Sequence, residues 1–226
     1  MTRDDIVARY RRLRAISKRQ QTAAMDRVAP DTMLDFGRRL GIVQGRTFIC
    51  DSPSEMDLLF DLCVYAGKPG RSRAIDRYAR SVEGTLHGDE AMMLRAAQSA
   101  SFRVWHVEQR HELAGLWVID LITGDRLWLI DEGLTATSPI GEAYAGRLKT
   151  VDDFVMTCGA MVPLSMTVMA AAIGNLLNVP AHRRMGVLDD PRIAIQFYRA
   201  AINTGTMETM EFRDPGTRQL EGELVE

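Results

Sequence analysis

The stretch that begins near residue 101 constrains the fold more than any other part of the sequence. It contains short runs rich in Trp, Val, Ile and Leu, and all three tryptophans of the 226-residue chain fall within it. Gly124 can supply the positive φ that a tight turn between two of these runs needs. The runs favour a five-stranded antiparallel sheet that is strongly curved or forms a half-open small barrel, with the tryptophans near its core. The expected strands cover residues 102–107, 116–120, 126–130, 143–149 and 154–157.

Helical patterns precede and follow the predicted sheet. Thr2 and Asp5 fit a capping box that opens a helix running to about residue 28. Ser52 as N-cap, Pro53 at the first helical position and Glu55 at the third open a second helix. Further helices are expected at residues 32–40, 71–82, 89–99, 165–177 and 191–203. We expect the helix at residues 165–177 to be among the most buried elements.

The predicted fold class is α+β, with N-terminal helices, the five-stranded antiparallel sheet, and C-terminal helices that pack on the sheet. The expected parts are a helical region (1–100), a β module (101–163), C-terminal helices (164–204) and an acidic, frayed tail (205–226). We expect the first three parts to form one compact unit.

Composition and charge exclude several classes of protein. Hydrophobic residues make up 46% and charged residues 26%, which is typical of a globular domain rather than a disordered chain. With 28 basic and 30 acidic residues the net charge is −2, which excludes a globally basic nucleic-acid binder. The N-terminus lacks the apolar region of a secretory signal, so we expect a cytoplasmic protein. Gly, Pro and Asn interrupt the uncharged residues 154–181, where we expect a strand and a buried helix and no membrane span.

The order of residues in the strand region resembles a β module of bacterial proteins of unknown function. The resemblance rests on Phe-Arg-Val-Trp-x-Val-Glu at 102–108, Asp-Leu-Ile-Thr-Gly-Asp at 120–125, Asp-Glu-Gly-Leu at 131–134, and Gly141 followed by Ala-Gly-Arg-Leu at 145–148. Some of those proteins carry a C-terminal SEC-C zinc motif, which is absent from this chain. The resemblance implies a bacterial origin and a compact β fold for residues 101–163, and it implies no reaction and no metal site.

The sequence lacks the motifs of the common catalytic and metal-binding sites. His106 and His111 do not have the spacing of an HExxH zinc motif. The chain has no GxSxG motif and no P-loop. Its three cysteines include no CxxC pair, which argues against a disulfide framework and a cysteine zinc site. We therefore expect no metal ion, no cofactor and no catalytic residue.

The strongest charge feature is the predicted first helix. Residues 1–24 contain seven bases and two acids, and four of the bases lie opposite an apolar stripe on a helical wheel. A basic loop at residues 67–73 precedes another predicted helix, whose N-terminus attracts anions. The candidate contacts for an acidic partner or a phosphate group are Arg11, Arg12, Lys18, Arg19, Lys68, Arg71, Ser72 and Arg73.

Three functional hypotheses follow from these features. The first is a non-enzymatic binding or adaptor protein whose basic N-terminal helix contacts an acidic protein surface or a nucleic acid. The second is an enzyme or small-ligand binder with a pocket between sheet and helices, in which His106, Asp120 and Cys158 are the polar groups. The third is a structural protein that forms homo-oligomers through the sheet edge or residues 154–181.

Overall fold

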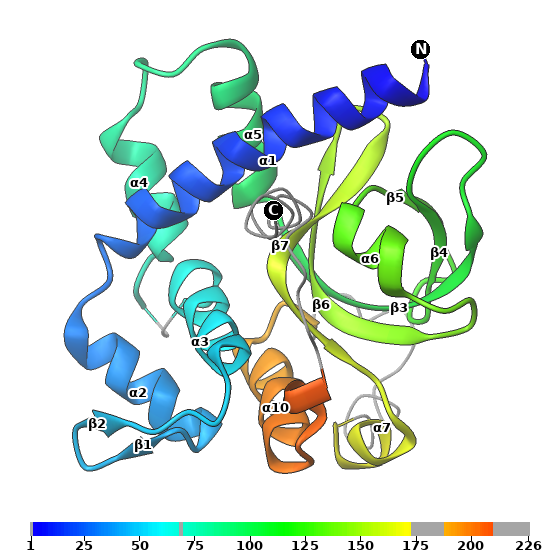
Figure 1. Cartoon of the computed structure of the whole chain (residues 1–226). Helices are drawn as coiled ribbons and strands as arrows, with labels where there is room; N and C mark the ends of the chain where they lie inside the picture. Colours follow the sequence, from blue (N-terminus) through cyan, green and yellow to red (C-terminus); the bar gives the residue numbers. More distant parts are fainter. Residues whose placement is uncertain (1, 68–69, 173–187, 210–226) are drawn as a thin grey trace, which may run out of the picture.

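The computed structural model describes residues 2–67, 70–172 and 188–209 (Figure 1). Its mixture of helices and strands confirms the predicted α+β class. The helices are α1 (Arg3–Met25), α2 (Pro30–Leu40), α3 (Pro53–Tyr65), α4 (Ala74–Ser81), α5 (Gly88–Gln98), α6 (Glu132–Thr137), α7 (Met166–Ala172), α10 (Pro191–Asn203) and the 3-10 helix η1 (Thr206–Thr209). The strands are β1 (Val43–Gln44), β2 (Thr47–Phe48), β3 (Ser101–Arg110), β4 (Leu116–Asp120), β5 (Arg126–Leu129), β6 (Ala143–Val151) and β7 (Phe154–Pro163).

The five long strands pair in the order β3-β4-β5-β7-β6, and β6 pairs again with β3, so the sheet closes on itself. The prediction of a strictly antiparallel, half-open sheet is therefore wrong. Four of the pairings are antiparallel, and β5 pairs with β7 in parallel through Leu129 and Val155. The physical reason is topological. An odd number of strands cannot alternate in direction all the way round a closed ring, so one neighbouring pair has to be parallel.

The interior of the closed sheet is apolar and holds only one of the three tryptophans. Trp105 is fully buried there and stacks on Tyr144 at a ring-centroid distance of 6.3 Å. Helix α6 lies across one end of the ring and contributes Leu134 to the same cluster (Figure 1). Trp117 and Trp128 face each other from β4 and β5 and are only half-buried. The expectation that all three tryptophans lie near the core is therefore wrong for these two.

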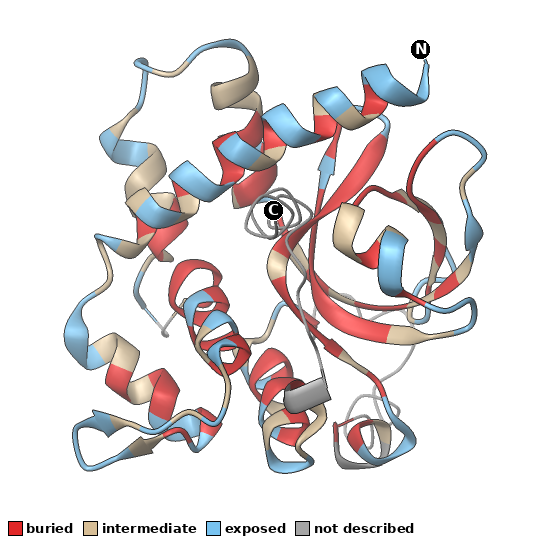
Figure 2. Cartoon of the chain, viewed as in Figure 1, coloured by how far each residue is buried: buried red, intermediate tan, exposed pale blue. Residues whose placement is uncertain are grey.

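Helices cover the outer face of β3, β6 and β7. Phe102 and Val162 from this face share an apolar cluster with Leu62 of α3 and Phe197 of α10. In Figure 2 the buried residues of α3 and α10 lie along the sides that face each other and the sheet. Burial of this kind contributes roughly 1.5–3 kcal/mol for each large apolar side chain. The cluster thus fixes α3 and α10 on the sheet.

Most of the predicted helix boundaries are confirmed by the structure. Thr2 and Asp5 form the expected capping box of α1, and α10 begins at the predicted Pro191. Ser52 precedes α3 without a side-chain cap, and its partner Glu55 accepts a hydrogen bond from the Asp51 amide instead. Helix α7 begins at Met166, close to the predicted start at residue 165, and residues 173–177 lie outside the described part of the chain. The expectation that this helix is among the most buried elements is wrong for its first turn, because Met166 is 86% exposed at the end of the β7–α7 connection. The short hairpin β1–β2 and helix α6 were not predicted.

Closure of the sheet depends on a glycine at the end of the β3–β4 connection. Gly115 has φ of +83°, and a Cβ atom at this position would lie 2.3 Å from the Leu129 carbonyl oxygen on β5. We predict that Gly115→Ala lowers the free energy of unfolding by about 3 kcal/mol or more, because the backbone of β5 would have to move. Gly124→Ala is the matched control, since Gly124 has φ of +77° with no atom nearby, and it should cost only about 1 kcal/mol. Urea unfolding measures both, and equal losses would contradict this account.

Candidate functional site

A cleft with a volume of about 1110 Å³ lies between the N-terminal helices and the sheet. Its walls are α1 and α3, and its floor is formed by β7 and the first residues of α6. Small-molecule pockets usually measure about 300–1,000 Å³, so this one is large. The charged and polar side chains that α1 contributes include Arg11, Arg14, Lys18 and Gln21, and the acidic lining residues are Asp57, Asp61, Asp131 and Glu132.

Strand β7 bulges where it forms the floor of the cleft. Gly146 of β6 pairs with Met161 and Leu148 pairs with Thr157, so one residue of β6 faces three of β7. Gly159, in the middle of the bulge, has φ of +120°, a conformation that favours glycine. Such bulges are common beside functional sites because they redirect side chains and end regular pairing.

Two side chains of α1 bind the bulged strand directly. Arg14 Nη1 donates to the Thr157 carbonyl oxygen at 3.0 Å, and Gln21 Nε2 donates to the Cys158 carbonyl oxygen at 2.5 Å. Gln21 also donates to the Tyr65 hydroxyl of α3 at 3.0 Å. These contacts hold α1, α3 and β7 together around the cleft.

A buried ion pair lies beneath α3 at the inner side of the cleft. Arg147 projects from the outer face of β6, and its Nε lies 3.2 and 3.3 Å from the two carboxylate oxygens of Asp61. The Tyr198 hydroxyl of α10 donates to Asp61 at 3.0 Å, and the Arg147 guanidinium lies 5.3 Å from the centre of the Tyr65 ring. Burial opposes the charge of Arg147, but the Asp61 carboxylate outweighs that effect and raises the pKa of the guanidinium.

Lys149 lies two residues further along β6 on the same outer face, beneath α1. Its ammonium donates to the Ser17 hydroxyl, and both side chains are buried. Burial lowers the pKa of Lys149 below its ordinary value. Among the described residues, no carboxylate forms an ion pair with Lys149. The outer face of β6 thus carries two buried cations, one neutralised under α3 and one held by a hydroxyl group under α1.

The acidic residues at the start of α6 have partners within the chain. Asp131 accepts from the Leu134 amide at 3.1 Å and from the Thr157 hydroxyl at 2.7 Å, which caps α6 and fixes it on β7. Glu132 pairs with Arg11 at 2.7 Å. Burial raises the pKa of Tyr10 on α1, and the nearby Asp131 carboxylate acts in the same direction. Asp131 is therefore a structural residue at one end of the cleft.

The groups that face a ligand most directly are Arg14, Lys18, Asp57 and Phe60. Within the described part of the chain, neither Arg14 nor Lys18 has a carboxylate partner, and Lys18 is exposed. Asp57 faces the cleft from α3, where desolvation raises the pKa of its carboxyl group. Phe60 has 37% of its surface exposed, which is high for an aromatic side chain.

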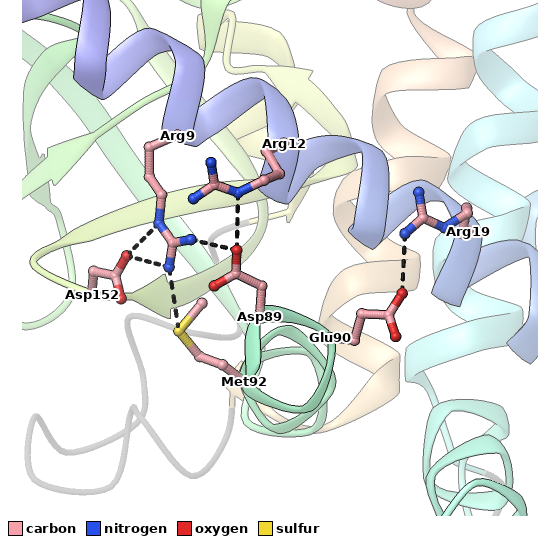
Figure 3. A network of polar contacts seen from close by, with 7 residues as sticks. All are labelled: Arg9, Arg12, Arg19, Asp89, Glu90, Met92 and Asp152. Atoms are coloured by element: carbon pink, nitrogen blue, oxygen red, sulfur yellow. Dashed lines mark hydrogen bonds and ion pairs between the residues drawn. The ribbon is translucent and has the colours of Figure 1, made fainter. Parts of the chain in front are cut away.

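The other predicted basic residues of α1 form ion pairs with acids of the chain itself. Arg12 Nε lies 3.0 Å from Asp89, and Arg19 lies 3.2 Å from Glu90, both of α5 (Figure 3). The neighbouring Arg9 joins Asp89 to Asp152 in the β6–β7 turn, at 2.5 and 3.0 Å (Figure 3). Arg11 pairs with Glu132 as described above. Of the four predicted residues of α1, only Lys18 keeps a charge with no partner among the described residues.

The predicted basic loop is a connection between helices. Arg73 forms an ion pair with Asp76 at 2.7 Å and donates to the Gln98 carbonyl oxygen. Ser72 accepts a hydrogen bond from Arg80, and Arg71 is exposed. Lys68 lies outside the described residues. The described residues of the loop do not line the cleft, and its role in phosphate binding stays a prediction.

The three predicted pocket residues do not come together. Asp120 is fully buried, pairs with Arg103 at 2.8 Å and accepts from the amides of the β4–β5 turn, so it shapes that turn. His106 is half-buried on β3 and does not line the cleft. Cys158 alone lies in the cleft, in the bulge of β7.

Sequence reasoning missed Asp61, Arg147 and Lys149. The signal that could have found the two cations is their spacing, because residues two apart on a strand share one face and most other residues of this strand are apolar. A buried cation on a sheet face predicts an acid on the covering helix. The sequence does not show which of the acids near α3 is that partner.

The described residues show no group of three or more His, Cys, Asp or Glu side chains that could hold a metal ion. Within that part of the chain, no helix is both long and apolar enough to cross a lipid bilayer. The three cysteines, all of which lie among the described residues, form no disulfide bond.

A family model described as a family of unknown function, DUF7986, matches residues 4–168. The chain belongs to this family. The part that matches DUF7986 runs from α1 to the start of α7, so it contains the closed sheet and every element of the cleft. Comparison with curated proteins and with solved structures found no match. No relationship to proteins with a SEC-C motif is shown.

The buried pair under α3 generates a prediction about stability. Asp61→Asn and Arg147→Met should each lower the free energy of unfolding by about 3 kcal/mol or more, because each leaves a buried charge without its partner. The double variant should lose clearly less than the sum of the two, since the pair is removed together. Urea denaturation of the four proteins completes the cycle, and additive losses would show that the pair does not couple α3 to β6.

Lys149 generates a prediction about pH. Its lowered pKa in the folded protein means that charging it costs free energy at neutral pH, and that this cost disappears as pH rises towards its unfolded value near 10.5. Lys149→Met should therefore be more stable than the natural chain at pH 7, by roughly 1 kcal/mol. The difference should shrink between pH 7 and 10, which chemical denaturation at several pH values would measure. A difference that stays constant with pH contradicts the buried, uncompensated ammonium.

Proposed function

We propose that this protein binds an extended acidic segment of another protein in the cleft between α1, α3 and β7. The observation that carries the proposal is the pair of cations, Arg14 and Lys18, that face this cleft without a carboxylate partner among the described residues. The exposed Phe60 lies in the same cleft. An amphipathic acidic peptide matches both the charge and the apolar surface.

The size of the cleft supports a peptide over a small compound. Its lining runs along α1 from Tyr10 to Met25, which corresponds to about 23 Å of helix at 1.5 Å per residue. Its volume of about 1110 Å³ exceeds the usual range for small-molecule sites. Several residues of an extended chain span that length.

The intramolecular ion pairs make the outer face of α1 a poor surface for nucleic acid. Arg12 and Arg19 would have to leave Asp89 and Glu90 before they could neutralise phosphates. Binding that depends on many phosphate contacts needs several free cations along one surface. A protein ligand with a few acidic residues requires only the two cations of the cleft.

The test uses a fluorescein-labelled dodecapeptide that alternates Glu with Leu and Phe, and fluorescence anisotropy as the readout. We predict that the peptide binds the full chain, that binding weakens as salt rises, and that Lys18→Glu weakens it at least fivefold, about 1 kcal/mol. Arg46→Glu is the matched control, because Arg46 is exposed in the β1–β2 turn, away from the cleft, and should leave affinity unchanged.

A control peptide with lysine in place of every glutamate should not bind, because the cations of the cleft would repel it.

Two results would contradict the proposal. One is an equal effect of Lys18→Glu and Arg46→Glu, which would show only a general charge effect. The other is tighter binding of a labelled oligonucleotide than of the acidic peptide under the same salt conditions.

A further inference from the structure

We infer that residues 210–226 of the chain occupy the same cleft and compete with an external ligand. This inference rests on the proposed function, since it assigns a regulator to that binding site. The segment lies outside the described residues, and the inference is drawn from the cleft, from the position at which the description ends, and from the sequence of the segment.

The described chain ends against two of the elements that form the cleft. The last described element, η1, contacts α3 and β7, which form one wall and the floor. Met207 of η1 is buried in the cluster that contains Leu62 of α3 and Ala160 of β7. The last described residue, Thr209, therefore lies in an element that contacts two of the elements forming the cleft.

The length of the segment suffices to cross the cleft. It has 17 residues, and an extended chain covers up to about 3.3 Å per residue. The lining of the cleft along α1 spans about 23 Å, as given above. Fewer than half of the 17 residues are needed to follow it from one end to the other.

The chemistry of the segment complements the cleft. It contains five acidic and two basic residues, for a net charge of −3, together with five large apolar side chains at Met210, Phe212, Leu220, Leu224 and Val225. Its acidic side chains match Arg14 and Lys18, its basic ones match Asp57, and its apolar ones match Phe60. The segment is thus the kind of ligand that the proposed function requires.

Attachment to the chain makes such competition effective. A tethered ligand acts at an effective concentration in the millimolar range when its linker is short, so even weak contacts fill the site. An external peptide then has to displace the segment. Its apparent affinity is the intrinsic affinity multiplied by the fraction of time that the cleft is empty.

The experiment places the photo-crosslinker p-benzoylphenylalanine at position 60 in the full chain. The residue there is exposed, so the substitution leaves the core intact. Irradiation and mass spectrometry should recover an intrachain crosslink from position 60 to residues 210–226. The same crosslinker at position 113 is the control, because Leu113 is also exposed, at 46% against 37% for Phe60, but lies outside the cleft and should give no such product.

An equal mixture of ¹⁵N-labelled and unlabelled protein distinguishes crosslinks within one chain from crosslinks between two copies. A crosslink to the segment of a second copy, or none to residues 210–226, overturns the inference. The triple substitution Glu221→Gln, Glu223→Gln and Glu226→Gln should reduce the intrachain product severalfold, and an unchanged yield would overturn the role of charge.

The peptide experiment distinguishes this inference from the proposed function. If the segment competes, the triple variant should bind the labelled acidic dodecapeptide at least threefold more tightly than the natural chain. Equal affinities with no crosslink mean that the cleft binds peptides without this regulator. A crosslink with no peptide binding by either protein means that the segment fills the cleft and the proposed function is wrong.

Discussion

The ion pair between Asp61 and Arg147 is the contact on which the placement of α3 depends. Arg147 is carried by the outer face of β6 and is buried by the helices that cover that face. An unpaired guanidinium in that position would cost several kcal/mol, so the covering helix has to bring a carboxylate to it. Tyr198 of α10 binds the same carboxylate, and the three elements are therefore fixed in one arrangement.

The cleft follows from that arrangement. With α3 fixed over Arg147 and α1 fixed over Lys149 by Ser17, the two helices leave a gap above β7, which is bridged by the side chains of Arg14 and Gln21. The bulge around Gly159 of β7 forms the floor of this gap. On the outer side of α1, Arg12 and Arg19 form ion pairs with Asp89 and Glu90 of α5 (Figure 3). The cations that stay available to a ligand are those that line the cleft.

The sequence predicted most elements and little of the site. Caps and breakers such as Thr2, Pro53 and Pro191 act within one or two turns, so a local pattern identifies them. The parallel pairing of β5 with β7 depends on the number of strands in the closed ring, which no single strand reveals. The partners of Arg12 and Arg147 lie 77 and 86 residues away, so the sequence showed their charges and not whether those charges are already neutralised.

The claim that the cleft between α1, α3 and β7 is the binding site is tested most directly by methyl NMR. In a chain labelled at its Ala, Ile, Leu and Val methyl groups, titration with the acidic dodecapeptide should shift the signals of Ala15, Val64 and Ala160, which line the cleft. The exposed methyl groups of Ile49, Leu113 and Ile140, which do not line it, should stay unchanged. Shifts confined to this second set would place the ligand elsewhere and contradict the account.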